Sequence, residues 1–294
     1  MIECALLRGR DRYERVVDGW IDNTHEDAFT HTVRLMDDDL GVELSAVATG
    51  SPSYEIREAR SRVQPAAGAL SDWALLGALA GARMVGGFTR RVGEAVEGRS
   101  GARHLVDAAV EVARLARQAT KMPPERAARA AAGPWECWQL DMSGWIDLPN
   151  SCFTYSDAGR ALFATRAVTT PMVPDLYSPP PGQARVFVRR KVARLAREGA
   201  RLVASHSMHD NVHGFEIRYE IDLEKGVIVA AESRTPRLPY LGICSEPQTK
   251  ISSLVGQAVD PNLRTRIQTL IGGASGCAQL YDLTADLLKL LRLY

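Results

Sequence analysis

Imidazole and carboxylate side chains gather in one short stretch of the C-terminal half, "SHSMHDNVHGFEIRYEID". It places four of them within eight residues: His206, His209, Asp210 and His213. Groups of this kind favour either acid/base catalysis, in which a carboxylate orients the imidazole, or metal binding. A histidine that is only hydrogen-bonded at the end of a sheet is the structural alternative. The alternation that follows this stretch predicts an antiparallel hairpin.

A metal site needs several ligands that converge on one point. On a strand, His206 points to the opposite face from His209, whereas His209 and His213 share a face. Two ligands converge in this way, and Cys244 or Cys277 would have to complete a zinc site. We therefore expect no metal. The sequence also lacks a GxSxG motif, a P-loop and a paired GxGxxG motif, so we expect no other cofactor.

The acid/base interpretation assigns His209 as the general acid or base and Asp210 as the carboxylate that orients it. Adjacent strand residues point to opposite faces, so these two share a pocket only where the strand ends or bulges. The N-terminal half offers a second pair, His25 and Glu26, and Glu26 can take the place of Asp210. We expect these four residues to line one shared groove.

Two internal similarities indicate an ancient duplication. Residues 79–117 align without gaps with residues 254–292, an offset of 175, and the identical pairs include Gly81/Gly256, Arg91/Arg266, Ser100-Gly101/Ser275-Gly276 and Asp107/Asp282. Upstream, at an offset of 184, His25, Glu26, Arg34 and Asp38 face His209, Asp210, Arg218 and Asp222. The matches keep the same order in both halves. Arg34 and Arg218 are therefore expected to bind substrate in equivalent positions.

Each half is predicted to contain strands followed by helices, which makes the fold class α+β. Two pseudo-symmetric units are expected, each an antiparallel meander with two or more helices after it. The predicted strands are 12–22, 28–36, 42–50, 215–221 and 226–232. The predicted helices are 75–97, 251–271 and two more that begin at Gly101 and Gly276. Ser100 and Ser275 are the predicted N-caps of these last two helices. Leucines at helical spacing predict a buried face on the last helix: Leu280, Leu283, Leu287, Leu290 and Leu291. The predicted units are 1–120 and 185–294, joined by 121–184.

The connecting segment is rich in aromatic residues and ends in a proline run. It is interpreted either as a substrate lid or as a strap that fills space between the halves. Four of its side chains are candidates to hold a substrate ring: Trp135, Trp138, Trp145 and Tyr155. Two basic stretches flank it, "RLARQATKMPPERAARA" and "RVFVRRKVARLAREGAR". Both are interpreted as helices with a solvated basic face or a phosphate or coenzyme A contact.

The composition is that of an ordinary globular protein. The 294 residues carry a net charge of +1 with 46% hydrophobic residues, so no overall field attracts polyanions. The sequence shows neither the pattern of a signal peptide nor a long apolar span, which predicts a cytoplasmic protein. The expected partner is a small-molecule substrate. No nucleic-acid or membrane contact is expected, and a homodimer is left open. Five widely spaced cysteines predict free thiols rather than disulfides.

Cys277 is a further catalytic candidate because it falls at the start of the last predicted helix. Unpaired N–H groups and the helix dipole at that position would lower the pKa of the thiol. A thiolate there can act as a nucleophile or base. The alternative is a small buried apolar side chain beside a tight glycine turn.

The sequence "HDNVHGFEIRYEID…LPYLGICSEPQ…SSLVGQAV…GGASGCAQLYDL" resembles the bacterial family known as domain of unknown function 2889. That family has an Ile-His-Asp-Met strand, an acidic hairpin, a Pro-x-Cys element, a Leu-Val-Gly helix and a closing Gly-Cys-Thr-His-Leu. The resemblance covers residues 185–292, with a degenerate copy at 12–117. It implies equivalents of the family residues at His209, Asp210, Cys244 and Gly276-Cys277. The chain departs from the pattern at Gln279, where the family has histidine, whereas the N-terminal copy keeps His104 and has Ala102 in place of the cysteine.

Two classes of function follow. The first is a cofactor-independent enzyme of lyase, isomerase or hydratase type that acts on a small aromatic or acyl substrate by histidine acid/base catalysis. The second is a non-catalytic protein that binds a small molecule between the two halves. A metal-dependent enzyme that uses histidine and cysteine ligands remains a further alternative.

We predict that the purified protein contains no stoichiometric zinc or iron, because strand geometry leaves too few convergent ligands. Elemental analysis of protein purified without chelators measures this directly. About one metal ion per chain, lost in a His209→Ala variant, would contradict the prediction.

Overall fold

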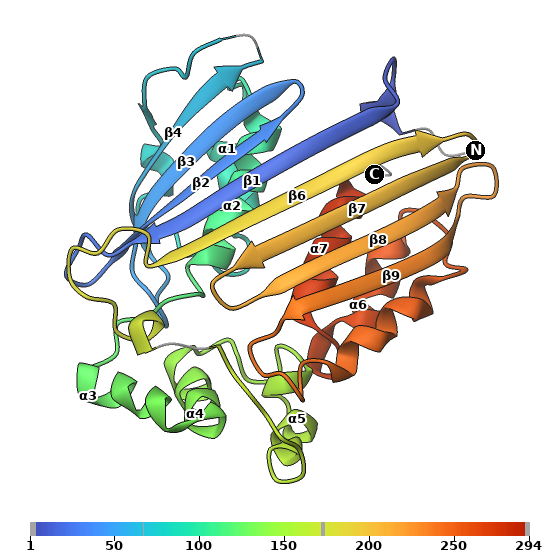
Figure 1. The fold of residues 1–294 in the computed structure, drawn as a ribbon. Coiled ribbons are helices and arrows are strands. Elements are labelled where there is room, and N and C mark those ends of the chain that lie inside the picture. Colours follow the sequence, from blue (N-terminus) through green and yellow to red (C-terminus); the bar gives the residue numbers. More distant parts are fainter. Residues whose placement is uncertain (1–3, 67, 172–173, 292–294) are drawn as a thin grey trace.

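One antiparallel sheet runs through both halves of the chain (Figure 1). The computed structural model describes residues 4–66, 68–171 and 174–291, and in these ranges the strand order is β5-β4-β3-β2-β1-β6-β7-β8-β9. The last position of the predicted repeat, 292, lies outside them. The strands are β1 (Arg12–Asp22), β2 (Phe29–Asp37), β3 (Leu40–Ala48), β4 (Ile56–Pro65), β5 (Ala74–Leu75), β6 (Phe187–Glu198), β7 (Arg201–Asp210), β8 (Gly214–Asp222) and β9 (Val227–Arg237).

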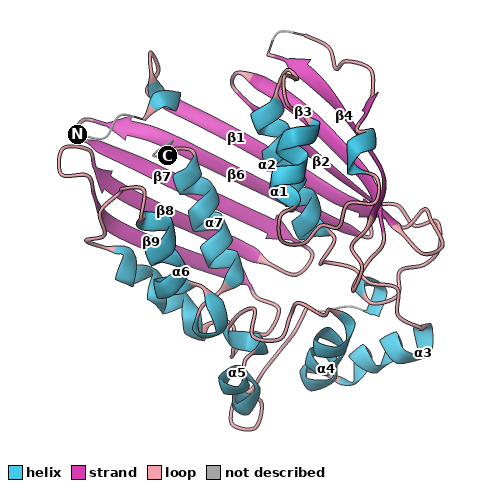
Figure 2. Cartoon of the chain, turned by 180° about the vertical axis from the view of Figure 1, so that it is seen from behind, coloured by secondary structure: helices cyan, strands magenta, loops and turns pink. Residues whose placement is uncertain are grey.

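The predicted α+β class is confirmed, with a meander and then helices in each half. Four helices cover one face of the sheet (Figure 2): α1 (Phe88–Ala95), α2 (Ala102–Leu115), α6 (Leu263–Ile271) and α7 (Ala278–Lys289). The five leucines predicted on the last helical face are all buried. Among the described residues, no helix has the length and apolar character needed to cross a membrane.

The two meanders are joined edge to edge and do not form two separate sheets. Strands β1 and β6 pair in antiparallel register from Arg12↔Ala196 to Ile21↔Phe187. Hydrogen bonds between these two central strands therefore make the two predicted meanders a single layer. This layer connects the predicted units 1–120 and 185–294.

The basic stretch at 185–201 is a strand and its hairpin, not a helix. Its side chains alternate between the two faces of the sheet, with Phe187, Arg189, Lys191, Ala193 and Leu195 buried toward the helices. This two-residue period fits a strand. The prediction failed because two of the inward positions carry charges, which hides the alternation in the sequence.

Other boundaries also differ from the predictions. Strand β4 was not predicted, and the segment expected as one helix at 251–271 consists of a 3₁₀ helix, Glu246–Leu254, followed by α6. The segment 75–97 divides into β5, a 3₁₀ turn and α1. The residues that cap α2 and α7 are Gly101 and Cys277, each one or two positions after the predicted serine.

The alignment at an offset of 184 is wrong at the level of strands. It matches β2, the second strand of its meander, with β8, the third strand of the other. The residues in equivalent strand positions are Arg15, paired with Asp37 between β1 and β2, and Arg189, paired with Asp210 between β6 and β7. Their offsets, 174 and 173, agree with the offset of 175 that relates the starts of α1 and α6.

The connecting segment forms short helices at one end of the sheet (Figures 1 and 2). These are α3 (Pro124–Ala127), α4 (Pro134–Gly144) and α5 (Asp157–Leu162), with 3₁₀ turns between and after them. Hydrogen bonds from Thr120 and Met122 to Leu176 and Tyr177 tie the two ends of the segment together. The described residues of the segment contribute to the core through Trp138, Leu140 and Trp145.

Buried charges join α2 and α7 beneath the centre of the sheet. The ammonium of Lys191 on β6 donates to Glu111 Oε1 at 2.7 Å and to Asp286 Oδ2 at 3.1 Å, and its side chain is 3% exposed. Arg114 on α2 lies 3.0 Å from Asp282 on α7. These ion pairs hold the helices of the two halves against each other.

We predict that Lys191→Ala lowers the free energy of unfolding by about 3–5 kcal/mol, because Glu111 and Asp286 lose a buried counter-charge. Arg190→Ala is the matched control. Arg190 is the preceding residue on the same strand but faces solvent, where its ion pair with Asp18 contributes less than about 1 kcal/mol. Urea unfolding of the three proteins gives the comparison, and equal losses in both variants would contradict the assignment.

Candidate functional site

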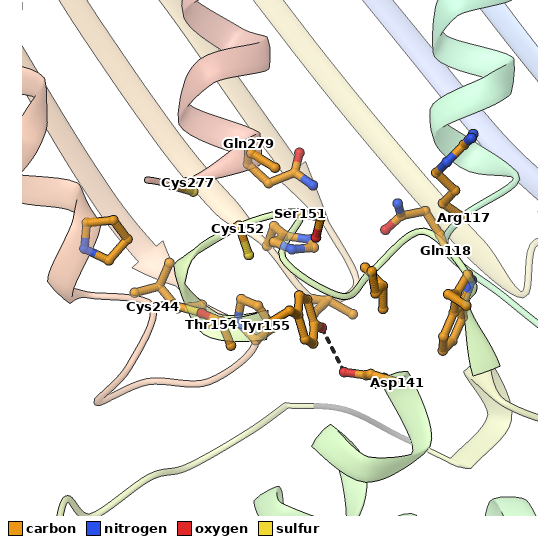
Figure 3. Close-up of a pocket in the computed structure, with 18 of the residues that line it drawn as sticks. Arg117, Gln118, Asp141, Ser151, Cys152, Thr154, Tyr155, Cys244, Cys277 and Gln279 are labelled. Carbon is orange, nitrogen blue, oxygen red and sulfur yellow. Dashed lines mark hydrogen bonds between the residues drawn. The ribbon is translucent and has the colours of Figure 1, made fainter. Parts of the chain in front are cut away.

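A cavity of about 130 Å³ opens where the connecting segment meets the C-terminal half (Figure 3). Its walls come from the end of α2, from α4 and the loop after it, from the β7–β8 turn, and from the start of α7. The polar and thiol residues that line it include Arg117, Gln118, Asp141, Ser151, Cys152, Thr154, Tyr155, His213, Cys244, Cys277 and Gln279. All three predicted segments of the chain therefore contribute to this one cavity.

His213 lines the cavity and is held by a buried carboxylate. Its Nδ1 lies 3.1 Å from Asp210 Oδ1, which also accepts the backbone N–H groups of Val212 and His213 at 2.8 and 2.6 Å. On the other side, Arg189 Nε donates to Asp210 Oδ2 at 2.9 Å. The contacts fix both the tight turn and the orientation of the imidazole.

Asp210 is fully buried, yet it remains ionised. Burial alone would raise the pKa of this carboxyl, but the charges and hydrogen bonds of His213 and Arg189 hold the pKa well below its usual range. A carboxylate beside the imidazole favours its Nδ1–H form, which leaves Nε2 as the nitrogen that can exchange a proton with a bound molecule.

Asp141 on α4 is the second buried carboxyl at the cavity. It accepts hydrogen bonds from three phenols: Tyr155 at 2.7 Å, Tyr177 at 2.8 Å and Tyr240. Burial raises the pKa of Asp141 to about 6, and the three phenolic hydrogen bonds with the charge of His213 limit the rise. The carboxyl therefore changes protonation close to neutral pH, as a catalytic acid or base must.

The three thiols at the cavity are neutral. Burial raises the pKa of Cys277 above its ordinary value and raises the pKa of Cys152 to about 11, and burial also raises the pKa of Cys244. The expected lowering at Cys277 is therefore wrong. Its Sγ does cap α7, where it accepts the Leu280 N–H at 3.5 Å, but the desolvation of the thiolate outweighs this contact.

His209 lies on the opposite face of the sheet from the cavity. Alternation along β7 sends Asp210 toward the helices and His209 outward, where its side chain is 46% exposed and 3.6 Å from Glu216. The expectation that His209 shares a pocket with Asp210 is therefore wrong. His213 does not share the face of His209 either, because the strand ends at Asp210 and the chain turns.

His25 and Glu26 lie in the β1–β2 loop, at a separate hollow next to the proline run. The backbone carbonyl of His25 accepts from Lys121 Nζ at 2.8 Å. The expected groove shared by His25, Glu26 and His209 does not form, because His25 and Glu26 line the hollow beside Lys121, whereas His209 lines a separate hollow with Glu216 and Arg218.

The two arginines predicted to bind substrate also lie away from the cavity. Arg34 donates to Gln64 at 3.1 Å, and Arg218 lies 2.8 Å from Glu220 on the solvent face of β8. Both occupy outward positions of their strands. They form part of the charged outer surface of the sheet and do not line the cavity.

Two of the four aromatic candidates line the cavity and two do not. Trp145 and Tyr155 are in the cavity wall. Trp135 and Trp138 stack on each other with ring centroids 5.1 Å apart, and the Trp138 indole donates to the Thr154 carbonyl at 2.9 Å. This pair positions the 3₁₀ turn that carries Tyr155.

Asp141 and His213 were not assigned a role from the sequence. His213 belongs to the histidine cluster, and the glycine directly after it marks a turn that could have separated it from the strand. Asp141 gave no comparable signal, since its three tyrosine partners are 14, 36 and 99 residues away. Within the described residues, no group of three or more histidine, cysteine, aspartate or glutamate side chains is arranged to hold a metal ion.

Comparison with known proteins gives one finding. Residues 194–291 match the sequence model of a family described as "Protein of unknown function (DUF2889)". The match covers β7 to α7 and the last part of β6, including Asp210, His213, Cys244 and Cys277. No curated protein and no solved structure matches the chain significantly.

We predict that one aspartate side chain titrates near pH 6, above the ordinary value of 3.8. The carboxyl should be mainly protonated at pH 5 and mainly ionised at pH 7.5, because burial penalises its charged form. Carbon-13 NMR of protein labelled at the aspartate carboxyl measures this, and the signal should be missing from Asp141→Asn. The assignment is contradicted if every aspartate signal titrates below about pH 5.

Proposed function

We propose that the protein is a cofactor-independent enzyme that performs acid/base chemistry of lyase, isomerase or hydratase type on a small aromatic or acyl substrate. His213 is the proposed acid/base group, and Asp210 is the residue that positions it. One observation carries the proposal: His213 and a carboxyl with a pKa near 6, Asp141, line the same small cavity.

Two proton-transfer groups of different kinds suit these reactions. A proton-transfer isomerase moves a proton from one substrate atom to another, an eliminating lyase takes a proton from carbon and protonates the leaving group, and a hydratase takes a proton from water and protonates the substrate. His213 Nε2 can accept a proton while the imidazolium is stabilised by Asp210. Asp141 can supply or take the second proton, because its pKa of about 6 leaves both forms populated near neutral pH.

Tyr155 has a supporting role in this proposal. Its phenol donates to Asp141 Oδ2 and its ring lines the cavity, so it links the carboxyl to any bound molecule. Burial and the charge of Asp141 raise the pKa of Tyr155 well above its ordinary value, so the phenol stays protonated. The neutral thiol of Cys277 is assigned to packing at the start of α7 rather than to nucleophilic attack.

The proposal also includes an origin by duplication in a bacterial lineage. The repeated pairs Arg15–Asp37 and Arg189–Asp210 support it, since each joins the first two strands of its meander in the same register. In the N-terminal half the third partner is His104, at 2.7 Å from Asp37. A cytoplasmic location and a small-molecule partner, with no nucleic-acid or membrane partner, belong to the same proposal, and a homodimer is compatible with it.

The test begins with a substrate, found by screening small aromatic and acyl compounds for a shift in melting temperature and then for turnover. We expect His213→Ala to lower kcat by roughly two to four orders of magnitude, the usual contribution of a general acid/base. Asp210→Asn should also lower kcat, but it removes a buried charge partner of Arg189, so its folding must be checked.

His209→Ala is the matched control, because it removes an exposed imidazole four residues from His213 on the other face of the sheet. It should retain turnover. Full activity of a folded His213→Ala variant would contradict the proposed role, and binding without turnover of any bound compound would favour the non-catalytic binding protein.

A further inference from the structure

The volume of the cavity suits a substrate with one ring. An engineered protein cavity of about 150 Å³ lined by apolar side chains holds a benzene molecule, and the cavity here measures about 130 Å³. Its remaining walls are apolar: Leu148, Leu176, Val212, Phe215, Leu238 and Pro239. A single aromatic ring with a small substituent fits this volume and lining.

The charge of the cavity is unfavourable for anions. Asp141 contributes a carboxyl that is mainly ionised above pH 6. The guanidinium of Arg117 is already occupied: it pairs with Asp147, donates to the carbonyls of Ala113 and Met84, and points away from Tyr155 and Asp141 (Figure 3). The described lining therefore offers no uncommitted arginine or lysine to a carboxylate or phosphate group.

The cavity wall contains a residue, Trp145, whose hydrogen-bond donor has no partner in the described part of the chain and which also lines a second hollow beside Met122. Trp145 is 3% exposed and lines the cavity, and its indole Nε1 is buried with no hydrogen-bond partner among the described residues. An unsatisfied buried donor destabilises a protein unless a ligand or water accepts from it. The ring is fixed edge-on to Tyr177 at 5.9 Å, so the N–H has a defined direction.

We infer that the substrate is a neutral, single-ring aromatic compound whose carbonyl or hydroxyl oxygen accepts a hydrogen bond from Trp145 Nε1. This rests on the proposed function, because it takes the cavity at His213 and Asp141 as the substrate site. It narrows that function, because the charge of the ionised Asp141 disfavours substrates that carry a carboxylate or a phosphate group in the cavity.

Benzamide and benzoate test the inference, since they share a ring and nearly the same shape but differ in charge. Calorimetric titration at pH 8 should show benzamide binding at least about tenfold more tightly than benzoate, because the ionised Asp141 repels the anion. At pH 5.5 the preference should shrink as Asp141 becomes protonated. In Asp141→Asn the preference for benzamide at pH 8 should be smaller than in the unaltered protein, because the carboxylate is removed while His213 stays.

Trp145→Phe tests the hydrogen bond, because it keeps an aromatic ring and removes the N–H. Benzamide affinity should fall roughly three- to tenfold, as expected for one hydrogen bond. Trp73→Phe is the matched control. Trp73 stacks against Arg60 and Arg62 on the outer side of the sheet, and its replacement should leave the affinity unchanged.

Each outcome is distinguishable from a failure of the proposed function, because the probes are bound and not turned over. Equal or tighter binding of benzoate at pH 8 contradicts the neutral-substrate inference and leaves the role of His213 standing. Binding of neither probe at millimolar concentration also contradicts it. Tight benzamide binding that depends on Trp145, together with unchanged turnover in His213→Ala, overturns the proposed catalysis alone.

Discussion

The buried carboxylate of Asp210 is the interaction on which the site depends. It ends β7 and receives Arg189 from the neighbouring strand, the two backbone N–H groups of the turn, and the imidazole of His213. A buried charge is tolerated only when it is paired and hydrogen-bonded. The geometry that satisfies Asp210 also determines where β8 begins and which way His213 points.

The connecting segment supplies the other half of the site. Its helix α4 carries Asp141, which accepts hydrogen bonds from three tyrosines. Two of these tyrosines belong to the segment and the third to the loop after β9, so the carboxyl joins the segment to the C-terminal half. The stacked pair Trp135 and Trp138 supports the turn that carries Tyr155. The described residues of the segment therefore form part of the cavity wall, and whether the segment acts as a substrate lid or as a strap stays a prediction.

Part of this could be predicted from the sequence. Strand β1 and the leucine face of α7 follow regular periods, and their predictions agree with the structure. Strand β6 was mistaken for a helix because Arg189 and Lys191 occupy inward positions, and their partners lie far away on Asp210, Glu111 and Asp286. Sequence periodicity cannot show that a charge is buried when its counter-charge is distant in the chain.

The site residues show the same limit. The histidine cluster lies at the end of β7, but which of its side chains lines the cavity depends on where the strand stops, and one residue decides whether His209 or His213 faces the helices. The position of Asp141 depends entirely on tertiary contacts.

The most direct test of the proposed site is a crystal structure of the protein with the tightest ligand from the melting-temperature screen. We expect the ligand within hydrogen-bonding distance of His213 and beside Asp141. A ligand bound on the outer face against His209 and Glu216 would contradict the proposed site.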